Sequence, residues 1–154
     1  MGEATQASPS LERVAPATSY RCSLVIPTKN GGELFKRVVA GLQKQTCWSD
    51  VEFIIVDSQS NDDTMETARA AGAKCLTVSA TEFNHGATRD YAISQATTNR
   101  IVLMVQDAVP YDNDTIERLI AALDDNKVAG VYARQIPQFD ADVITKRNLN
   151  THLT

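Results

Sequence analysis

The chain has 154 residues, of which 43% are hydrophobic and 22% are charged, and its formal net charge is -4. This length and composition suit one globular domain with a buried core. The negative net charge argues against a nucleic-acid-binding protein that works through a basic face.

The first 20 residues are rich in Ala, Ser, Thr and Pro and lack periodicity, so they predict a loose tail. Short apolar runs with β-branched residues then recur along the chain, and each predicts a buried strand. These predicted strands are residues 23–27, 52–57, 74–79, 100–105 and 127–133.

Helical patterns lie between the predicted strands. Apolar residues at helical spacing predict three buried faces: Phe35, Val38, Val39 and Leu42; Ala92, Ile93 and Ala96 within residues 86–97; and Ile116, Leu119, Ile120 and Leu123. Ser60 and Asp63 have the spacing of an N-cap and its partner, and Gly72 predicts the end of that helix. Asp112 or Asn113 is the predicted cap of the last helix.

Strands that alternate with helices predict an α/β fold with a mainly parallel sheet and helices on both faces. Ligands of such sheets bind just outside the carboxyl ends of the strands. The residues that follow the first four predicted strands are mostly polar, and they offer carboxylates, amides, hydroxyls and one guanidinium. This set suits a nucleotide with a diphosphate better than an apolar ligand.

Common nucleotide and catalytic motifs are missing from the sequence. The segment after the first strand, Lys29-Asn30-Gly31-Gly32, has neither the G-x-G-x-x-G pattern nor the G-K-[ST] of a phosphate loop. There is also no H-E-x-x-H, no Cys/His zinc spacing and no G-x-S-x-G. The three cysteines, Cys22, Cys47 and Cys75, are odd in number and far apart, so they predict free thiols in a reducing cytoplasm.

Most polar residues at the strand ends have two interpretations. Asp57 either caps a turn or binds a ligand, and Asp62 and Asp63 are typical of a helix start, where acids are favoured. Arg89 falls in the first turn of a predicted helix, where a cation is disfavoured, so an anionic partner is indicated. Asp107 is a lone acid after an apolar strand, and a bound cation explains it best.

Five segments together carry a family resemblance. SLVIPTKNGG, FIIVDSQSNDDT, FNHGATRDYA, LMVQDAVP and VAGVYARQIP, in this order, resemble the family-2 glycosyltransferases of the GT-A fold. More narrowly, they are similar to the rhamnosyltransferase-like branch, in which a Q-D-A segment stands where other members carry D-x-D. The resemblance covers roughly residues 22–137, and Val105 takes the place of the first Asp of that motif.

The resemblance implies a nucleotide-sugar site on the strand ends. It places Pro27, Thr28 and Asn30 around the base and ribose, Asp57 on the pyrimidine ring, and Ser58 and Ser60 in the loop around it. It also implies that Gly86 allows close backbone approach, that Arg89 meets the base or the diphosphate, and that Gln106 touches the ribose or sugar. Asp107 would bind a divalent cation, Mg²⁺ or Mn²⁺, that bridges the two phosphates.

The implied activity is inverting transfer of a sugar, with rhamnose as a candidate, from a dTDP- or UDP-sugar to a saccharide or lipid-linked acceptor. It would serve surface polysaccharide synthesis in the cytoplasm, with a peripheral position at the inner face of the membrane as a further expectation. The family's catalytic base would lie beyond Thr154. We therefore expect a donor-binding domain at 21–137, the start of an acceptor-side region at 138–154, and no transfer by this chain alone.

Two alternatives stay open. A non-catalytic nucleotide-sugar-binding module needs no acceptor machinery and fits the same residues. A nucleotidyltransferase would show a Gly-rich loop with Arg or Lys after the first strand, which Lys29-Asn30-Gly31-Gly32 matches poorly. Without the acceptor half, the helix and strand faces that it would cover should be exposed. Self-association as a homodimer would hide these faces.

Overall fold

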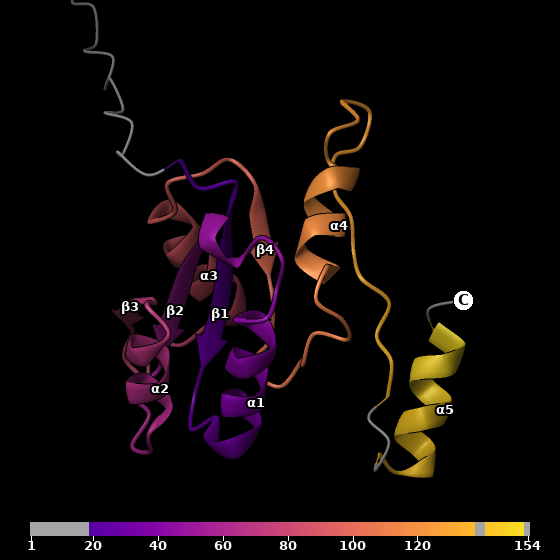
Figure 1. Cartoon of the computed structure of the whole chain (residues 1–154). Helices are drawn as coiled ribbons and strands as arrows, with labels where there is room; N and C mark the ends of the chain where they lie inside the picture. The colour runs from indigo at the N-terminus through magenta and orange to yellow at the C-terminus, as the bar shows by residue number, and fades with distance from the viewer. Residues whose placement is uncertain (1–18, 138–140, 153–154) are drawn as a thin grey trace, which may run out of the picture.

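The computed structural model describes residues 19–137 and 141–152. Its centre is a parallel sheet with the strand order β3-β2-β1-β4 (Figure 1). The strands are β1 (Cys22–Thr28), β2 (Val51–Asp57), β3 (Lys74–Thr77) and β4 (Ile101–Leu103). These elements confirm the first four predicted strands. The predicted tail lies, except for its last two residues, outside the described part of the chain.

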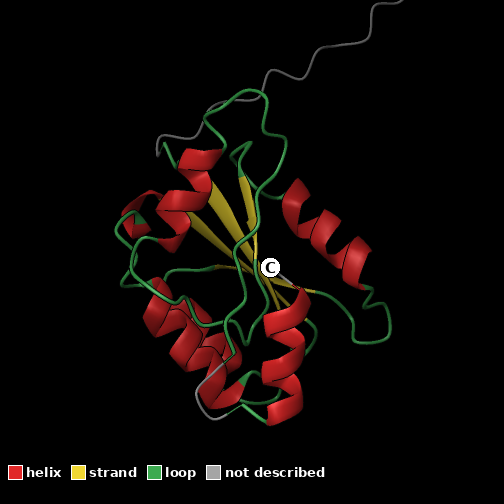
Figure 2. Cartoon of the chain, turned by 90° about the vertical axis from the view of Figure 1, so that its right-hand side faces the viewer, coloured by secondary structure: helices red, strands yellow, loops and turns green. Residues whose placement is uncertain are grey.

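Helices cover both faces of the sheet, as predicted (Figure 2). On one face, α1 (Gly32–Leu42), α2 (Thr64–Ala70) and α4 (Thr115–Ala122) share an apolar cluster with β1 and β2. On the other, α3 (His85–Ser94) packs Ala92 against Val25, Ile54 and Val56. A short 3-10 turn, η1 (Trp48–Asp50), precedes β2, and α5 (Val143–His152) ends the described chain.

The two central strands form the core of the domain. Every residue of β2 is buried, and so is every residue of β1 except the half-buried Pro27, as expected for parallel strands covered on both faces. Pro27 lies beyond Val25, the last residue of β1 that pairs with β4, so its missing N–H falls where the β1–β4 pairing has ended. The predicted helical face of α1 is confirmed, because all four of its apolar residues are buried.

The end of α2 follows the prediction, whereas its start does not. Gly72 adopts φ +80°, and the N–H groups of Gly72 and Ala73 bond the carbonyls of Arg69 and Ala68, which is a Schellman ending. At the start, the helix begins at Thr64, so the prediction of Ser60 as N-cap is wrong. The Ser60 hydroxyl instead donates to the Asp57 carboxylate at 2.5 Å.

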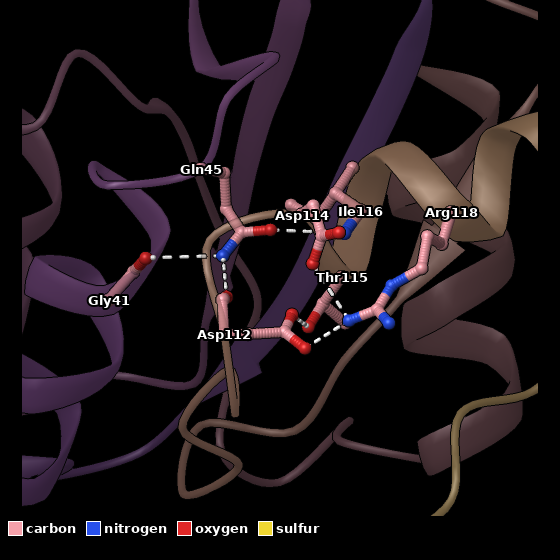
Figure 3. A network of polar contacts seen from close by, with 7 residues as sticks. All are labelled: Gly41, Gln45, Asp112, Asp114, Thr115, Ile116 and Arg118. Carbon is pink, nitrogen blue, oxygen red and sulfur yellow. Dashed lines mark hydrogen bonds and ion pairs between the residues drawn. The ribbon is translucent and has the colours of Figure 1, made fainter.

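The predicted cap of α4 is also wrong. Asp114 occupies the N-cap position without a side-chain bond to the helix, and the α4 backbone is capped from a distant loop. The buried Gln45 accepts the Ile116 N–H at 3.0 Å and donates to the Asp112 carbonyl at 2.6 Å (Figure 3). Asp112 instead accepts the Thr115 hydroxyl and pairs with Arg118. A cap that lies 71 positions away in the sequence leaves no local signal.

The predicted fifth strand, residues 127–133, does not form. Within the described residues, β4 is the last strand on its side of the sheet. A β-branched pattern forms a strand only where a neighbour satisfies its backbone N–H and C=O groups. The segment runs instead as a loop in which the Tyr132 side chain is 83% exposed.

All three cysteines are free thiols, as predicted, with Cys22 and Cys47 buried. Burial raises the pKa of the Cys22 thiol to about 12. None of the helices in the described residues has the length and apolar character that crossing a membrane requires.

Candidate functional site

A pocket of about 410 Å³ opens at the carboxyl edge of the sheet. The loops that follow all four strands contribute to it, together with the first turns of α3. Its lining residues are Pro27, Thr28, Lys29, Ser58, Ala80, Phe83, His85, Arg89, Val105 and Gln106. The carboxyl ends of the strands therefore meet around one cavity, as the sequence predicted.

Asp57 lies just behind this lining and is only 2% exposed. Its carboxylate accepts the Thr28 hydroxyl at 2.9 Å, the Ser60 N–H at 2.8 Å and the Ser60 hydroxyl at 2.5 Å. A carboxylate offers about four acceptor positions. Asp57 therefore fixes the loop after β2 and retains capacity for one more donor.

The loop after β1 uses all of its backbone N–H groups inside the protein. Lys29, Asn30, Gly31 and Gly32 donate to side chains outside this loop, namely to Gln106 Oε1 at 2.8 Å, Ser60 Oγ at 2.7 Å, Thr64 Oγ1 at 2.8 Å and Asp62 Oδ2 at 3.0 Å. A phosphate loop would present such groups to its ligand. In this site, side chains are left to meet an anionic ligand.

Two backbone positions explain the sequence of this loop. A Cβ on Gly31 would come within 2.6 Å of the Phe35 Cβ, so only glycine fits against α1. Asn30 adopts φ +46°, and its side-chain oxygen accepts the Asn61 N–H at 2.9 Å. Asn30 thus joins the loops after β1 and β2 but does not line the pocket.

The start of α3 brings a cation to the pocket. Asn84 caps the helix by accepting the N–H groups of Gly86 and Ala87. Arg89 lines the pocket one turn further on, and its guanidinium donates to the His85 carbonyl at 3.4 Å. A Cβ on Gly86 would meet only Asn84 Oδ1, at 3.5 Å, so the fold itself does not require glycine there.

The segment after β4 contributes Gln106 and Asp107. Gln106 lines the pocket and bonds the backbone of Lys29 through both ends of its amide. Asp107, the residue after Gln106, is exposed, and within residues 19–137 and 141–152 its carboxylate has no hydrogen bond or ion pair. No cluster of three or more His, Cys, Asp or Glu in that part of the chain could hold a metal.

Of the residues predicted at the site, Pro27, Thr28, Ser58, Arg89 and Gln106 line the pocket. Sequence reasoning missed the other lining residues, Lys29, Ala80, Phe83, His85 and Val105. Phe83 and His85 flank the cap residue Asn84 and meet edge to face at 4.9 Å. Their position on either side of a helix cap is a sequence feature by which these two residues could have been predicted at the site. Nothing in the local sequence distinguishes Ala80.

Comparisons with known proteins agree with this architecture. Residues 23–153 match the model for "Glycosyl transferase family 2". The chain is 33% identical over 134 residues to the O-antigen chain rhamnosyltransferase RfbN of Salmonella typhimurium LT2, and 35% identical over 132 residues to WbaN, of the same description, of Salmonella anatum. These alignments cover 84% and 83% of this chain but 42% of each relative, so the chain spans less than half their length.

A solved structure shows the same fold. The mannosyltransferase PcManGT of Pyrobaculum calidifontis, described as a complex with GDP-Man and Mn²⁺, superposes with a TM-score of 0.61 at 23% identity over 79% of this chain and 37% of its own. At that identity the likeness concerns the GT-A fold. The family match over residues 23–153 and the two relatives show that the chain belongs to glycosyl transferase family 2.

Proposed function

We propose that this chain is the donor-binding part of a glycosyltransferase that uses a nucleoside diphosphate sugar. The pocket at the carboxyl edge of the parallel sheet carries the proposal, because a cation and several polar groups from four loops meet there. The relatives named as O-antigen rhamnosyltransferases support rhamnose as the donor sugar. The acceptor would then be a saccharide or a lipid-linked saccharide of a surface polysaccharide, met at the inner face of the membrane.

The geometry supports separate roles for the residues that would face the base and for those that would face the diphosphate. Asp57 has a remaining acceptor position for the N–H of a pyrimidine ring, which favours dTDP- or UDP-sugars. Arg89 supplies a positive charge for the diphosphate. Pro27, Thr28 and Ser58 would form the wall against which the base lies.

The exposed carboxylate of Asp107, next to the lining residue Gln106, fits a divalent cation that phosphates help to hold. Asp107 presents a carboxylate that no described neighbour uses, and carboxylate oxygen is the ligand that Mg²⁺ and Mn²⁺ prefer. With one protein carboxylate, the diphosphate and water would supply the other ligands. When bound, such a cation would neutralise charge on the departing diphosphate.

A thermal-shift screen tests the proposal. The chain is heated with dTDP, UDP or GDP, each with and without Mn²⁺, and with pyrophosphate as a control. A pyrimidine diphosphate at 100 times its Kd should raise the unfolding free energy by about 2.7 kcal/mol. We expect dTDP or UDP to stabilise more than GDP, and more with Mn²⁺ than without. Equal stabilisation by all three nucleotides, or by none, would contradict the proposed function.

A further inference from the structure

Gln106 holds the backbone of Lys29 from both sides. Its Oε1 accepts the Lys29 N–H at 2.8 Å, and its Nε2 donates to the Lys29 carbonyl at 3.1 Å. The strand pairing between β1 and β4 ends at Val25 and Leu103. Thr28, the last residue of β1, and Gln106, which lies beyond β4, each follow three residues later. One side chain thus replaces the backbone ladder where β4 has ended.

Lys29 continues the connection toward β2. Its ammonium donates to the Ser58 carbonyl at 2.6 Å and to the Gln59 carbonyl at 2.7 Å. Gln59 adopts φ +62°, an unfavourable conformation for a residue with a Cβ. The ammonium stabilises this turn by binding two carbonyls that converge on it.

Gln59 completes the connection toward β3, because its Oε1 accepts the Ala80 N–H at 3.2 Å. We call the series Gln106, Lys29, Ser58–Gln59 and Ala80 the strand-end belt. It crosses the carboxyl edge in the order β4, β1, β2, β3, which is the order of the strands in the sheet. All its members except Gln59 line the pocket, so the belt forms part of the pocket wall.

We propose that Gln106 and Lys29 are positioning residues, which hold the strand-end belt in place and thereby set the distance between the base-facing and cation-facing ends of the pocket. This inference rests on the proposed function. Asp107 has no partner of its own within the described residues, so its position depends on the Gln106 backbone next to it. Ordering these loops before the ligand arrives lowers the cost of binding.

The belt gives Gln106 a different role from direct contact with the ribose or sugar. If it acts through Lys29, its loss should loosen the loops even without ligand. It should also weaken mainly the cation-dependent part of nucleotide affinity, because Asp107 follows it. Loss of the Lys29 ammonium should instead free the loop after β2 and weaken binding with or without the cation.

The experiment uses Gln106→Met and Lys29→Met, which keep the side-chain length and remove the hydrogen bonds. Lys29→Arg is the conservative variant, since a guanidinium also donates to two carbonyls. Gln43→Met and Lys44→Met make the same changes on exposed side chains near the end of α1 and serve as matched controls. Two measurements follow: amide hydrogen exchange of the free proteins, and calorimetric affinity for dTDP with and without Mn²⁺.

In the free protein, we expect Gln106→Met to speed exchange of the Lys29 amide and Lys29→Met to speed exchange of the Ala80 amide. With Mn²⁺, Gln106→Met should lower dTDP affinity about tenfold, the worth of one or two net hydrogen bonds. Its affinity without Mn²⁺ should change little. Lys29→Met should lose affinity in both conditions, and Lys29→Arg should recover most of it.

The results separate this inference from the proposed function. If the wild type binds dTDP and Gln106→Met has unchanged exchange or unchanged affinity, the positioning role is overturned. If Gln106→Met loses affinity equally with and without Mn²⁺, the coupling to Asp107 is overturned. A wild type that binds no nucleotide overturns the proposed function and this role with it, whatever the exchange rates show.

Discussion

At the scale of single residues, polar side chains at this sheet edge hold the loops in place as well as facing a ligand. Asp57 holds the turn after β2 through three hydrogen bonds, and Asp62 accepts the N–H groups of Gly32 and Thr64. The Thr64 hydroxyl and these N–H groups lower the pKa of the Asp62 carboxyl. Asp62, which is typical of a helix start in the sequence, therefore joins the loops after β1 and β2.

Asp57→Asn should destabilise the fold. The amide keeps the shape but has one acceptor oxygen in place of two, which leaves a Ser60 donor unsatisfied. We expect the free energy of unfolding, measured by urea denaturation, to fall by about 1–3 kcal/mol. Asp125→Asn changes an exposed carboxylate and should shift it by under about 0.5 kcal/mol. Equal effects of the two substitutions would show that the buried bonds to Asp57 contribute nothing.

The same position should decide base preference. The wild-type chain should bind UDP more tightly than GDP, because the Asp57 carboxylate can accept the N–H of a pyrimidine ring. Asp57→Asn should lose most of that preference while it still binds both nucleotides through the diphosphate. Competition binding against a fluorescent nucleotide measures the ratio. A ratio that Asp57→Asn leaves unaltered would remove Asp57 from base recognition.

At the scale of elements, α4 is held to the rest of the domain by long-range polar contacts as well as by Ile116 and Ile120. Gln45 caps its start, Arg21 pairs with Glu117 through two bonds of 2.7 and 2.8 Å, and Arg100 pairs with Asp124 at 2.7 Å. β4 pairs with β1 over only three residues. The contacts of α4 therefore help to hold this end of the sheet and α4 together.

Gln45→Leu should weaken the docking of α4. The substitution leaves the Ile116 N–H and the Asp112 carbonyl without their partner in a buried place. We expect the free energy of unfolding to fall by about 1–3 kcal/mol. Gln43→Leu, on the exposed end of α1, is the control and should have little effect. A Gln45→Leu protein as stable as the control would mean that water replaces the cap.

Acid should loosen the same element. The Arg21 guanidinium lowers the pKa of Glu117, and the Thr115 hydroxyl and Arg118 lower that of Asp112. Groups with a lowered pKa stabilise the fold fully above their unfolded pKa, about 4.3 for Glu and 3.9 for Asp. This contribution is lost as the pH falls below those values toward the folded pKa.

Urea midpoints measured from pH 7 to pH 3 test this dependence. Glu117→Gln should be less stable than the wild type at pH 7, and the two curves should converge as the pH approaches 3. Curves that stay parallel over the whole range would show that the Glu117 pKa does not differ between the folded and unfolded chain.

At the scale of the whole molecule, the sequence predicted what depends on local pattern. β1 and β2 and the buried face of α1 agree with the pattern to within a residue, because burial on both sides leaves a continuous apolar signal. The prediction of a strand at 127–133 was wrong, because strand pairing depends on a neighbour that the local pattern does not reveal. The gathering of polar strand ends around one pocket was predicted, whereas the strand-end belt was not, because its bonds join loops 21 to 77 positions apart.

The central claim is that this edge of the sheet binds a nucleoside diphosphate together with a cation at Asp107. The most direct measurement is calorimetric titration of dTDP, with and without Mn²⁺, into the wild type, Asp107→Ala and the exposed control Asp125→Ala. We predict that Mn²⁺ raises the affinity of the wild type and the control but not of Asp107→Ala, whose stability should change by under about 0.5 kcal/mol. An equal gain from Mn²⁺ in all three proteins, or no gain in the wild type, would contradict the account.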